Sequence, residues 1–318
     1  MEGCAPAIDR SYVISCEHCH KLIGRLLTMA VTHFWINDQL VPLVDAKVSV
    51  LDHGFTVADG VFETLLVTDG KVFALDRHLV RLAKSALGLG IAMPDVATIA
   101  NGVSQVLTMN PKVDFGRLRI TITSGSGPLG SDRTATAPTL VISLAEQAAW
   151  PATTKVLLVP WSRNENSPLA GLKTTSYAEN VYALDAAKTQ GFSEAIFCDT
   201  SGRLCEGTGS NIFLVKNDQI FTPSEASGLL RGITRDLVIE WANDSGFVVV
   251  ERDVDPSELW DADEVFITSS TRDIHPVSEL AKLDNAENVV DRRTLVPGLV
   301  TEKLGNIFVT QRAERLNP

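Results

Sequence analysis

Long hydrophobic runs are absent from this 318-residue sequence, and cysteine is scarce. The apolar stretches are short, such as Val156–Val159, and none approaches the roughly 18 residues of a membrane-spanning helix, so we expect no membrane partner. Five cysteines are too few for a disulfide framework and odd in number, which favours reduced thiols and a cytoplasmic location. The N-terminus lacks a basic stretch followed by an apolar one, so no secretory signal is expected.

Basic side chains are outnumbered, with 28 Lys and Arg against 39 Asp and Glu and a formal net charge of −11. An acidic chain repels phosphate backbones at long range, so nucleic acid is not expected as a partner, although a local phosphate site is not excluded. Hydrophobic residues at 45% and charged residues at 21% are ordinary globular values, which exclude a disordered or low-complexity chain.

Three of the five cysteines lie in the first 28 residues, where Cys16-Glu17-His18-Cys19-His20 has the C-x-x-C-H spacing of a haem attachment or of half a zinc site. Haem attachment would need export to an oxidising compartment. A zinc site would need a second pair of ligands, and Cys198 and Cys205 are too far apart to form a second C-x-x-C. We therefore expect residues 1–28 to be a poorly ordered extension without a metal site.

The rest of the chain has the length of about two domains. Turn and periodicity signals predict a smaller α+β domain over residues 29–148 and a larger, α/β-like domain over 149–318, with the boundary between about 145 and 154. The expected helices cover residues 76–88, 95–109, 178–190 and 233–245. The first should end near Gly88 and Gly90. The third should bury a face with Val181, Leu184 and Ala187, and the fourth a face with Leu237, Val238 and Trp241. The expected strands cover residues 35–41 and 61–74 as hairpins, then 116–123, 139–144, 155–160, 195–199, 211–215, 247–251 and 264–268. The strands at 195–199 and 211–215 are expected to be joined across Thr200-Ser201-Gly202.

One glycine-rich segment, Gly125–Gly130, has the G-x-G-x-x-G pattern and follows an expected strand. A dinucleotide-binding fold would need a helix to begin there. The residues that follow, Ser131–Pro138, are polar and lead into another strand. We therefore interpret this segment as a hairpin loop.

Two other segments have the chemistry of an anion site. Arg231-Gly232-Ile233-Thr234 opens an expected helix, where free backbone N–H groups attract negative charge. Thr268-Ser269-Ser270-Thr271 adds small hydroxyl side chains at the end of an apolar strand. Together with the basic Arg81, they predict a phosphate cradle without a P-loop.

Two further residues are candidates for covalent cofactor chemistry. Lys173 follows the apolar and small residues 169–172, and a lysine with reduced solvation can lose its proton and form a Schiff base. Glu206 begins Glu206-Gly207-Thr208-Gly209-Ser210-Asn211, where small residues around a carboxylate let a flat ligand approach the backbone. Taken alone, Lys173 is better explained as an ordinary surface lysine.

Six motifs, in this order and with this spacing, resemble the fold-type IV pyridoxal-phosphate enzymes, also called class IV aminotransferases. They are Asp59–Thr64, His78–Leu82, Gly171–Lys173, Glu206–Phe213, Gly232–Arg235 and Glu264–Ser270. The resemblance runs from about Trp35 to Val277. It implies a two-domain fold similar to that of D-amino-acid aminotransferase, pyridoxal 5'-phosphate as the cofactor, and a homodimer whose loops, here Val113–Arg117 and Ser124–Arg133, reach the partner's site.

The resemblance also implies roles for individual residues. Lys173 would be the catalytic residue and form the Schiff base with the cofactor, and Glu206 would pair with the pyridine nitrogen. The residues implied for the cofactor phosphate are Arg81, Ile233, Thr234, Ser269 and Ser270. Tyr177 would approach the phenolic oxygen of the cofactor. The residues implied for the substrate side are Phe62, Thr64, Leu129 and Thr271.

The reaction has two interpretations at this stage. One is a ping-pong transfer of an amino group from an amino acid or amine to a 2-oxo acid. The other is the 4-amino-4-deoxychorismate lyase reaction of folate synthesis, which gives p-aminobenzoate and pyruvate, and Gly171–Lys173 with Glu179 looks similar to that branch. Leu129 and Ser131 stand where D-amino-acid aminotransferases have an Arg and a His, which argues against D-amino acids. We favour an aminotransferase; an inactive binding dimer is the remote alternative, against which the intact Lys173 argues.

Overall fold

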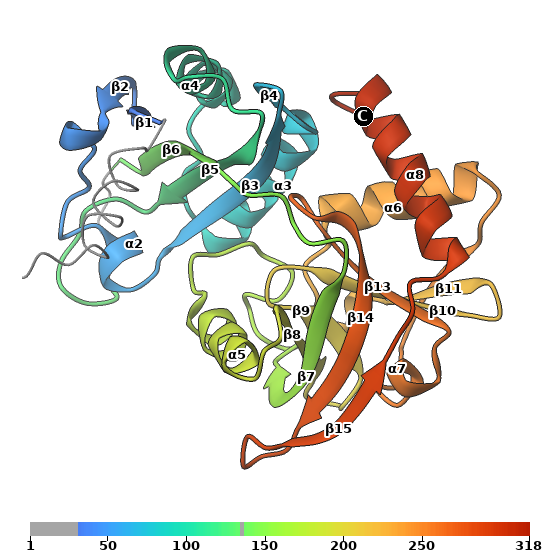
Figure 1. Ribbon diagram of the computed structural model, residues 1–318. Helices are drawn as coiled ribbons and strands as arrows, with labels where there is room; N and C mark the ends of the chain where they lie inside the picture. Colours follow the sequence, from blue (N-terminus) through green and yellow to red (C-terminus); the bar gives the residue numbers. More distant parts are fainter. Residues whose placement is uncertain (1–30, 134–136) are drawn as a thin grey trace, which may run out of the picture.

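The computed structural model describes residues 31–133 and 137–318, which form two β-sheets with helices packed on each (Figure 1). Cys4 and the Cys16–His20 motif lie outside the described residues. The mixed helix and strand architecture that the sequence predicts is confirmed. No helix in the described ranges has both the length and the hydropathy that crossing a bilayer requires.

The first sheet has six antiparallel strands in the order β2-β1-β6-β5-β3-β4. Its strands are β1 (His33–Ile36), β2 (Gln39–Pro42), β3 (Gly60–Thr68), β4 (Lys71–Val72), β5 (Phe115–Thr123) and β6 (Thr139–Glu146). Helices α3 (Leu75–Leu89) and α4 (Val96–Met109) pack their apolar faces on it, and the short helix α2 (His53–Thr56) precedes β3. Helix α3 ends at Gly90, whose φ of 69° is left-handed, as expected for a glycine cap.

The second sheet has nine strands, mostly in the order β12-β11-β10-β13-β14-β7-β8-β9, with β15 paired to β14. Its strands are β7 (Thr154–Arg163), β8 (Glu194–Asp199), β9 (Leu204–Gly207), β10 (Asn211–Lys216), β11 (Gln219–Pro223), β12 (Val249–Arg252), β13 (Glu264–Ser269), β14 (Asp273–Leu283) and β15 (Val289–Thr294). Its helices are α5 (Ala178–Thr189), α6 (Ile233–Asp244), α7 (Glu258–Asp261) and α8 (Leu299–Glu314). Parallel pairs (β7 with β8 and β14, β11 with β12) make the sheet mixed.

The two sheets share an apolar cluster as well as a connecting segment. Leu66, Phe73 and Ala74 of the first half pack with buried residues of α6 and α8, including Trp241 and Phe308. Figure 1 shows α6 and α8 beside the end of the first sheet where β4 and α3 lie. The segment 147–153 joins β6 to β7. The domain bounds 29–148 and 149–318 stay a prediction, and this position of the connecting segment is compatible with them.

Most elements lie where the sequence predicts them, and the differences follow after one confirmed interpretation. Gly125–Gly130 connects the antiparallel strands β5 and β6, which confirms the hairpin interpretation. The strand that pairs with β8 across Thr200-Ser201-Gly202 is β9, not the expected strand at 211–215, which pairs with β11 and β13. In α5 the buried side chains are Asn180, Ala183 and Ala187, whereas Val181 is exposed, so its predicted apolar face is wrong at that position. Strands β9, β11, β14 and β15 and helices α2, α7 and α8 were not predicted.

Candidate active site

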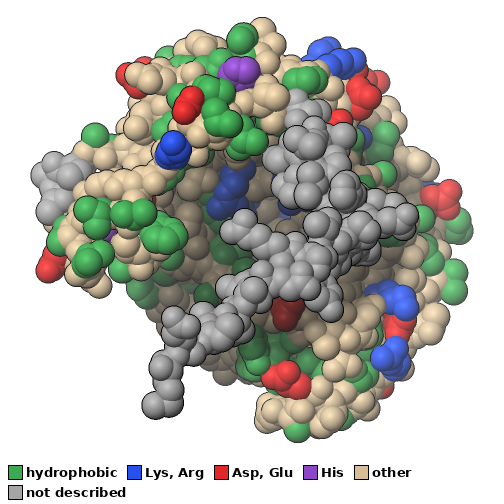
Figure 2. Space-filling model, turned by 60° about the vertical axis from the view of Figure 1, so that its left-hand side comes forward, with side chains coloured by type: hydrophobic (Ala, Val, Ile, Leu, Met, Phe, Trp, Pro, Cys, Tyr) green, Lys and Arg blue, Asp and Glu red, His purple; other side chains and the backbone are tan. Residues whose placement is uncertain are grey.

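A pocket of about 900 Å³ lies between the two sheets and is lined by residues from both. Figure 2 shows this face of the molecule hollowed, with basic side chains on the inner wall. Eleven of the twelve predicted site residues line the pocket: Phe62, Thr64, Arg81, Lys173, Tyr177, Glu206, Ile233, Thr234, Ser269, Ser270 and Thr271. Leu129 does not line the pocket, and its side chain is exposed on the β5–β6 loop.

Lys173 reaches the pocket from the segment between β7 and α5. Its Nζ lies 3.2 Å from the hydroxyl of Tyr177 and 4.5 Å from the centroid of the Phe62 ring. Tyr177 precedes the first residue of α5, and its ring meets Phe62 edge-on at 5.0 Å between centroids. The amine is therefore held between two aromatic rings and one hydroxyl, within hydrogen-bond reach of a group that can exchange a proton with it.

Glu206 lies on β9, at the wall formed by the second sheet. Its Oε2 accepts a hydrogen bond of 3.0 Å from the backbone N–H of Leu230, and its Oε1 lies 3.6 Å from Arg163 Nε. Burial raises the pKa of Glu206 to about 7, against the opposing effects of Arg163 and the Leu230 N–H. The carboxyl thus has one oxygen fixed and the other directed at a site where a ligand nitrogen could share its proton.

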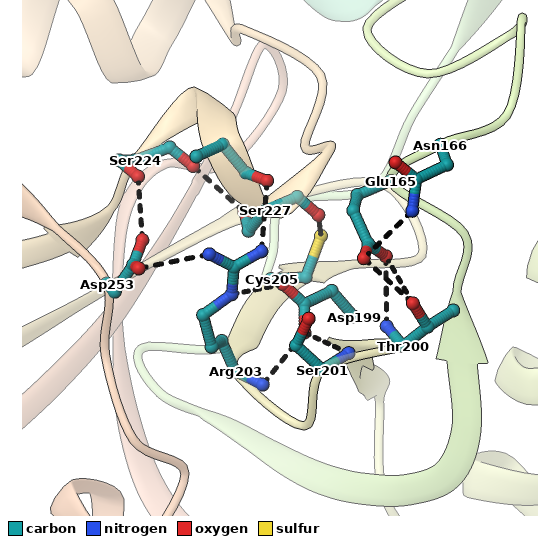
Figure 3. A network of polar contacts seen from close by, with 11 residues as sticks. Glu165, Asn166, Asp199, Thr200, Ser201, Arg203, Cys205, Ser224, Ser227 and Asp253 are labelled. Carbon is teal, nitrogen blue, oxygen red and sulfur yellow. Dashed lines mark hydrogen bonds and ion pairs between the residues drawn. The ribbon is translucent and has the colours of Figure 1, made fainter.

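A polar network holds the β8–β9 turn that leads to Glu206 (Figure 3). The buried Asp199 accepts hydrogen bonds from Ser201 N and from Arg203 N and Nε. Arg203 also donates to Asp253 and to the Ala226 carbonyl, and Cys205 Sγ donates to the Ser227 carbonyl. These bonds tie β9 to the segment that carries Leu230, so the network fixes the distance between Glu206 and its N–H donor.

Arg81 is bound by a buried carboxylate at another part of the pocket. Its Nε and Nη2 donate to Glu63 at 2.8 and 2.7 Å, and its Nη1 donates to the Arg231 carbonyl at 3.0 Å. His78 Nδ1 lies 2.7 Å from the same carboxylate. Burial would raise the pKa of Glu63, but the charges and hydrogen bonds of Arg81 and then His78 hold it well below its usual value. Glu63 is therefore ionised, and it fixes the plane of the guanidinium group.

The N-terminus of α6 opens into the pocket next to Arg81. Gly232 caps the helix, and a Cβ at this position would lie 2.1 Å from Asn211 Oδ1, so no other residue fits without a shift. The turn Ser269–Arg272 between β13 and β14 faces it, with Ser270 and Thr271 on the pocket wall. The buried Thr268 Oγ1 in this wall has no hydrogen-bond partner among the described residues. Free helix N–H groups, a cation and an unpaired hydroxyl together form an anion cradle.

Two pocket residues, Arg119 and Arg163, and the buried Glu63 that binds Arg81 were missed by the sequence analysis. Arg119 on β5 stacks over Phe62 at 3.7 Å, and burial lowers its pKa. Within residues 31–133 and 137–318, no carboxylate lies within 4.0 Å of its guanidinium, and its one hydrogen bond of 3.0 Å goes to Thr121. Arg163 approaches Glu206, and Glu63 binds Arg81. The available signal was the charged residues of three strands: Glu63 inside the mostly apolar β3, Arg119 inside β5, and Arg163 at the end of β7.

The arrangement fits pyridoxal 5'-phosphate, the cofactor that the sequence motifs imply. The anion cradle suits a phosphate, Glu206 suits a ring nitrogen that shares a proton, and Lys173 lies in the same pocket with its amine free of any carboxylate partner within the described residues. The buried Thr268 Oγ1 and Arg163 Nε both lack a hydrogen-bond partner in the described part of the chain, as expected where a ligand supplies one. No three His, Cys, Asp or Glu of the described residues are grouped as metal ligands would be.

Comparison with known sequences identifies the family. The family model described as amino-transferase class IV matches residues 60–280. A Methanocaldococcus jannaschii protein named as a branched-chain-amino-acid aminotransferase is 37% identical over 284 residues, which cover 86% of this chain and 94% of that protein. The D-alanine aminotransferase of Bacillus licheniformis is 30% identical over 253 residues, covering 77% of this chain and 87% of that enzyme.

Solved structures agree with this assignment. The branched-chain aminotransferase of Thermoproteus uzoniensis, solved with norvaline, superposes with a TM-score of 0.80 at 27% identity and covers 87% of this chain and 93% of its own. A Legionella pneumophila protein named as a 4-amino-4-deoxychorismate lyase has a TM-score of 0.75 at 25% identity, covering 85% of this chain and 96% of its own. The fold, the pocket and these matches lead to one conclusion: the chain belongs to the class IV aminotransferase family and is an enzyme that depends on pyridoxal phosphate.

Proposed function

We propose that this enzyme transfers an amino group from an amino acid or amine to a 2-oxo acid in a ping-pong sequence, in which the deaminated donor leaves before the acceptor binds. The observation that carries the proposal is the common pocket of Lys173, Glu206 and Arg81, in which each of the three groups would contact a different part of the cofactor. When bound, pyridoxal phosphate supplies an electrophilic carbonyl and an electron-accepting ring.

Lys173 is proposed to carry the cofactor covalently and then to move the proton. Once a substrate amine displaces it, the Lys173 amine stays in the pocket and can take a proton from the substrate carbon and return one nearby. The Tyr177 hydroxyl, 3.2 Å from Nζ, orients this amine. Phe62, beside both groups, excludes water from the place where the proton moves.

Glu206 and the anion cradle are proposed to orient the ring. With a pKa near 7, the Glu206 carboxyl is matched to a ring nitrogen and can hold a proton between them. Arg81, Ile233, Thr234, Ser269 and Ser270 would bind the phosphate through a guanidinium, helix N–H groups and hydroxyls. Anchored at both ends, the ring cannot rotate away from Lys173.

The substrate is proposed to bind between Phe62, Thr64 and Thr271. Arg119 is added to this set because its guanidinium is half-buried in the pocket wall without an acidic partner among the described residues, which suits a carboxylate of the substrate. The cytoplasm is the proposed location, since Cys198 and Cys205 are free thiols.

The lyase remains the second candidate, because the Legionella protein named for that reaction shares the fold. A direct test incubates the holoenzyme with a panel of L-amino acids, D-amino acids and amines, and separately with aminodeoxychorismate. We expect loss of the visible cofactor band with the amino donor and its return on adding a 2-oxo acid. Release of p-aminobenzoate without any such response to amino donors would overturn the proposal in favour of the lyase, and no response to either would favour an inactive binding protein.

A further inference from the structure

Lys173 follows β7 of the second sheet in the sequence, but its main chain is hydrogen-bonded to elements of the first half of the molecule. Its backbone N–H donates to the hydroxyl of Ser85 on α3 at 3.1 Å, and its carbonyl accepts from Phe62 N on β3 at 3.0 Å. The next residue, Thr174, forms a β-bridge with Val61. Both polar groups of the Lys173 backbone are thus used by α3 and β3.

The same two elements also hold Arg81. Ser85 lies four residues after Arg81 on α3, so the two side chains lie on one face, one turn apart. Glu63 on β3 follows Phe62 directly, and its buried carboxylate binds Arg81 and His78 of α3. Lys173 and Arg81 are therefore both held by neighbouring parts of α3 and β3.

From these contacts we propose that Ser85 is a positioning residue for Lys173, and that α3 and β3 form one unit that fixes the spacing between the reactive lysine and the phosphate-binding arginine. Ser85 is fully buried, so no water can replace its oxygen as the acceptor for the Lys173 N–H. Any movement of one half of the molecule against the other would carry Lys173 and Arg81 together. The proposal rests on the proposed function, because it takes Lys173 as the cofactor-linked lysine.

The test compares holoenzymes of wild type, Ser85→Ala and Ser85→Cys, with Ser278→Ala as the control. Ser278 is a partly buried serine on β14, whose hydroxyl donates to the Thr154 carbonyl away from the pocket. Cysteine is close to serine in size but a weaker acceptor, so this variant keeps the packing while weakening the bond. Three quantities are measured: cofactor retained on dialysis, the fraction fixed to Lys173 by borohydride and peptide mapping, and the pH midpoint of the visible band.

We expect Ser85→Ala to retain the cofactor almost as wild type does, since Arg81 is untouched. Its fraction fixed to Lys173 should fall about fivefold, as for the loss of one hydrogen bond, and its band midpoint should move by at least about half a pH unit. Ser85→Cys should lie between wild type and Ser85→Ala, and Ser278→Ala should match wild type.

Two results would overturn this inference: a fixed fraction and midpoint unchanged in Ser85→Ala, or an equal loss of cofactor and of fixation in both Ser85 variants, which would indicate a general role in folding. The failure of that part of the proposed function on which this inference rests, the assignment of Lys173 as the cofactor-linked lysine, is a different result. In that case borohydride would not fix the cofactor to Lys173 in the wild type itself.

Discussion

At the scale of single residues, the site combines two carboxyl groups of opposite behaviour with one amine that has no acidic partner in the described part of the chain. Glu63 is buried but paired with Arg81 and His78, so its pKa is held low and its charge is permanent. Glu206 is also buried, but Arg163 and the Leu230 N–H offset the effect of burial only in part, so its pKa rises to about 7. One carboxylate therefore serves to hold a cation, and the other is available to share a proton with a ligand.

Replacing Lys173 with alanine tests the covalent role directly. We expect turnover to fall by at least about a thousandfold, because the proton-transfer amine is lost together with the covalent link, while the cofactor remains bound without being fixed by borohydride. Lys188→Ala, an exposed lysine on α5, is the matched control and should behave as wild type. More than trace activity in Lys173→Ala, with a cofactor still reducible onto the chain, would show that another lysine has this role.

The raised pKa of Glu206 predicts a pH dependence of stability in the cofactor-free protein. The folded chain keeps a proton on Glu206 that the unfolded chain releases above its ordinary pKa of 4.5. The resulting stabilisation is fully present below pH 4.5 and is lost as the pH rises through about 7, and amounts to up to about 3 kcal/mol. Glu206→Gln cannot titrate, so its free energy of unfolding should fall less than that of wild type between pH 5 and 8.

Urea unfolding of the two cofactor-free proteins at pH 5 and pH 8 measures this difference. Glu302→Gln, at an exposed carboxylate on α8, is the control and should keep the wild-type pH trend. Parallel pH trends in Glu206→Gln and wild type would mean that the Glu206 carboxyl is not perturbed in the folded protein.

At the scale of elements, local signals predicted helices α3 to α6, but not the short helices α2 and α7 or the C-terminal helix α8. Gly90 ends α3 where the sequence places a cap, and the buried face of α6 carries Leu237, Val238 and Trp241 as expected. Strand β9 was missed because it is only four residues long and its Glu206 interrupts any apolar pattern. Val181 faces outward because α5 packs through its alanines, which a hydrophobicity pattern undervalues.

The residues of the site divide in the same way, into those predicted from local sequence motifs and those brought together by packing. Nine of the eleven predicted residues that line the pocket belong to the motifs, and Tyr177 and Thr271 follow closely after one. Ser85 and Arg119, by contrast, contribute through contacts with Lys173 and Phe62, which are 88 and 57 positions away. No local rule connects such pairs, since only the packing of α3 and β5 against the Lys173 segment and β3 brings them together. Leu129 shows the converse, because this position of the β5–β6 loop was named from the resemblance and does not line this pocket.

The N-terminus of α6 offers a test of an element rather than of a side chain. In Gly232→Ala the new Cβ would meet Asn211 Oδ1 at 2.1 Å, so either the helix start or Asn211 must shift. Because the free N–H groups of α6 would then point away from the phosphate, we expect the affinity for pyridoxal phosphate to fall about tenfold or more. Titration of the cofactor-free variant measures this, with Gly305→Ala on α8, where the Cβ meets nothing within 4 Å, as the control. Equal affinities in both variants would show that the N-terminus of α6 does not contribute to phosphate binding.

At the scale of the whole molecule, the segment just before the motif Asp59–Thr64 exposes many apolar side chains. The segment 43–57 exposes seven large apolar side chains: Leu43, Val44, Val48, Val50, Leu51, Phe55 and Val57. Leu129, on a loop whose Gly127 packs against His53, adds another exposed apolar group. Exposed apolar side chains gathered on one segment are typical of protein–protein interfaces. We propose that this apolar patch pairs two copies of the chain, as the family resemblance implies.

The dimer leads to the last prediction. Phe55→Asp introduces a charge at the most exposed aromatic ring of the patch, so burying it against a second copy would be strongly unfavourable. We expect light scattering of wild type at micromolar concentration to give a mass near twice 34.4 kDa, and Phe55→Asp to move towards a single chain. Leu87→Asp, at an equally exposed leucine on α3 outside the patch, should stay dimeric. Activity should fall with the dimer, because the 900 Å³ pocket is open and a partner loop carrying Leu129 would help to close it. A wild-type mass near that of one chain with full activity would contradict both the dimer and the shared site.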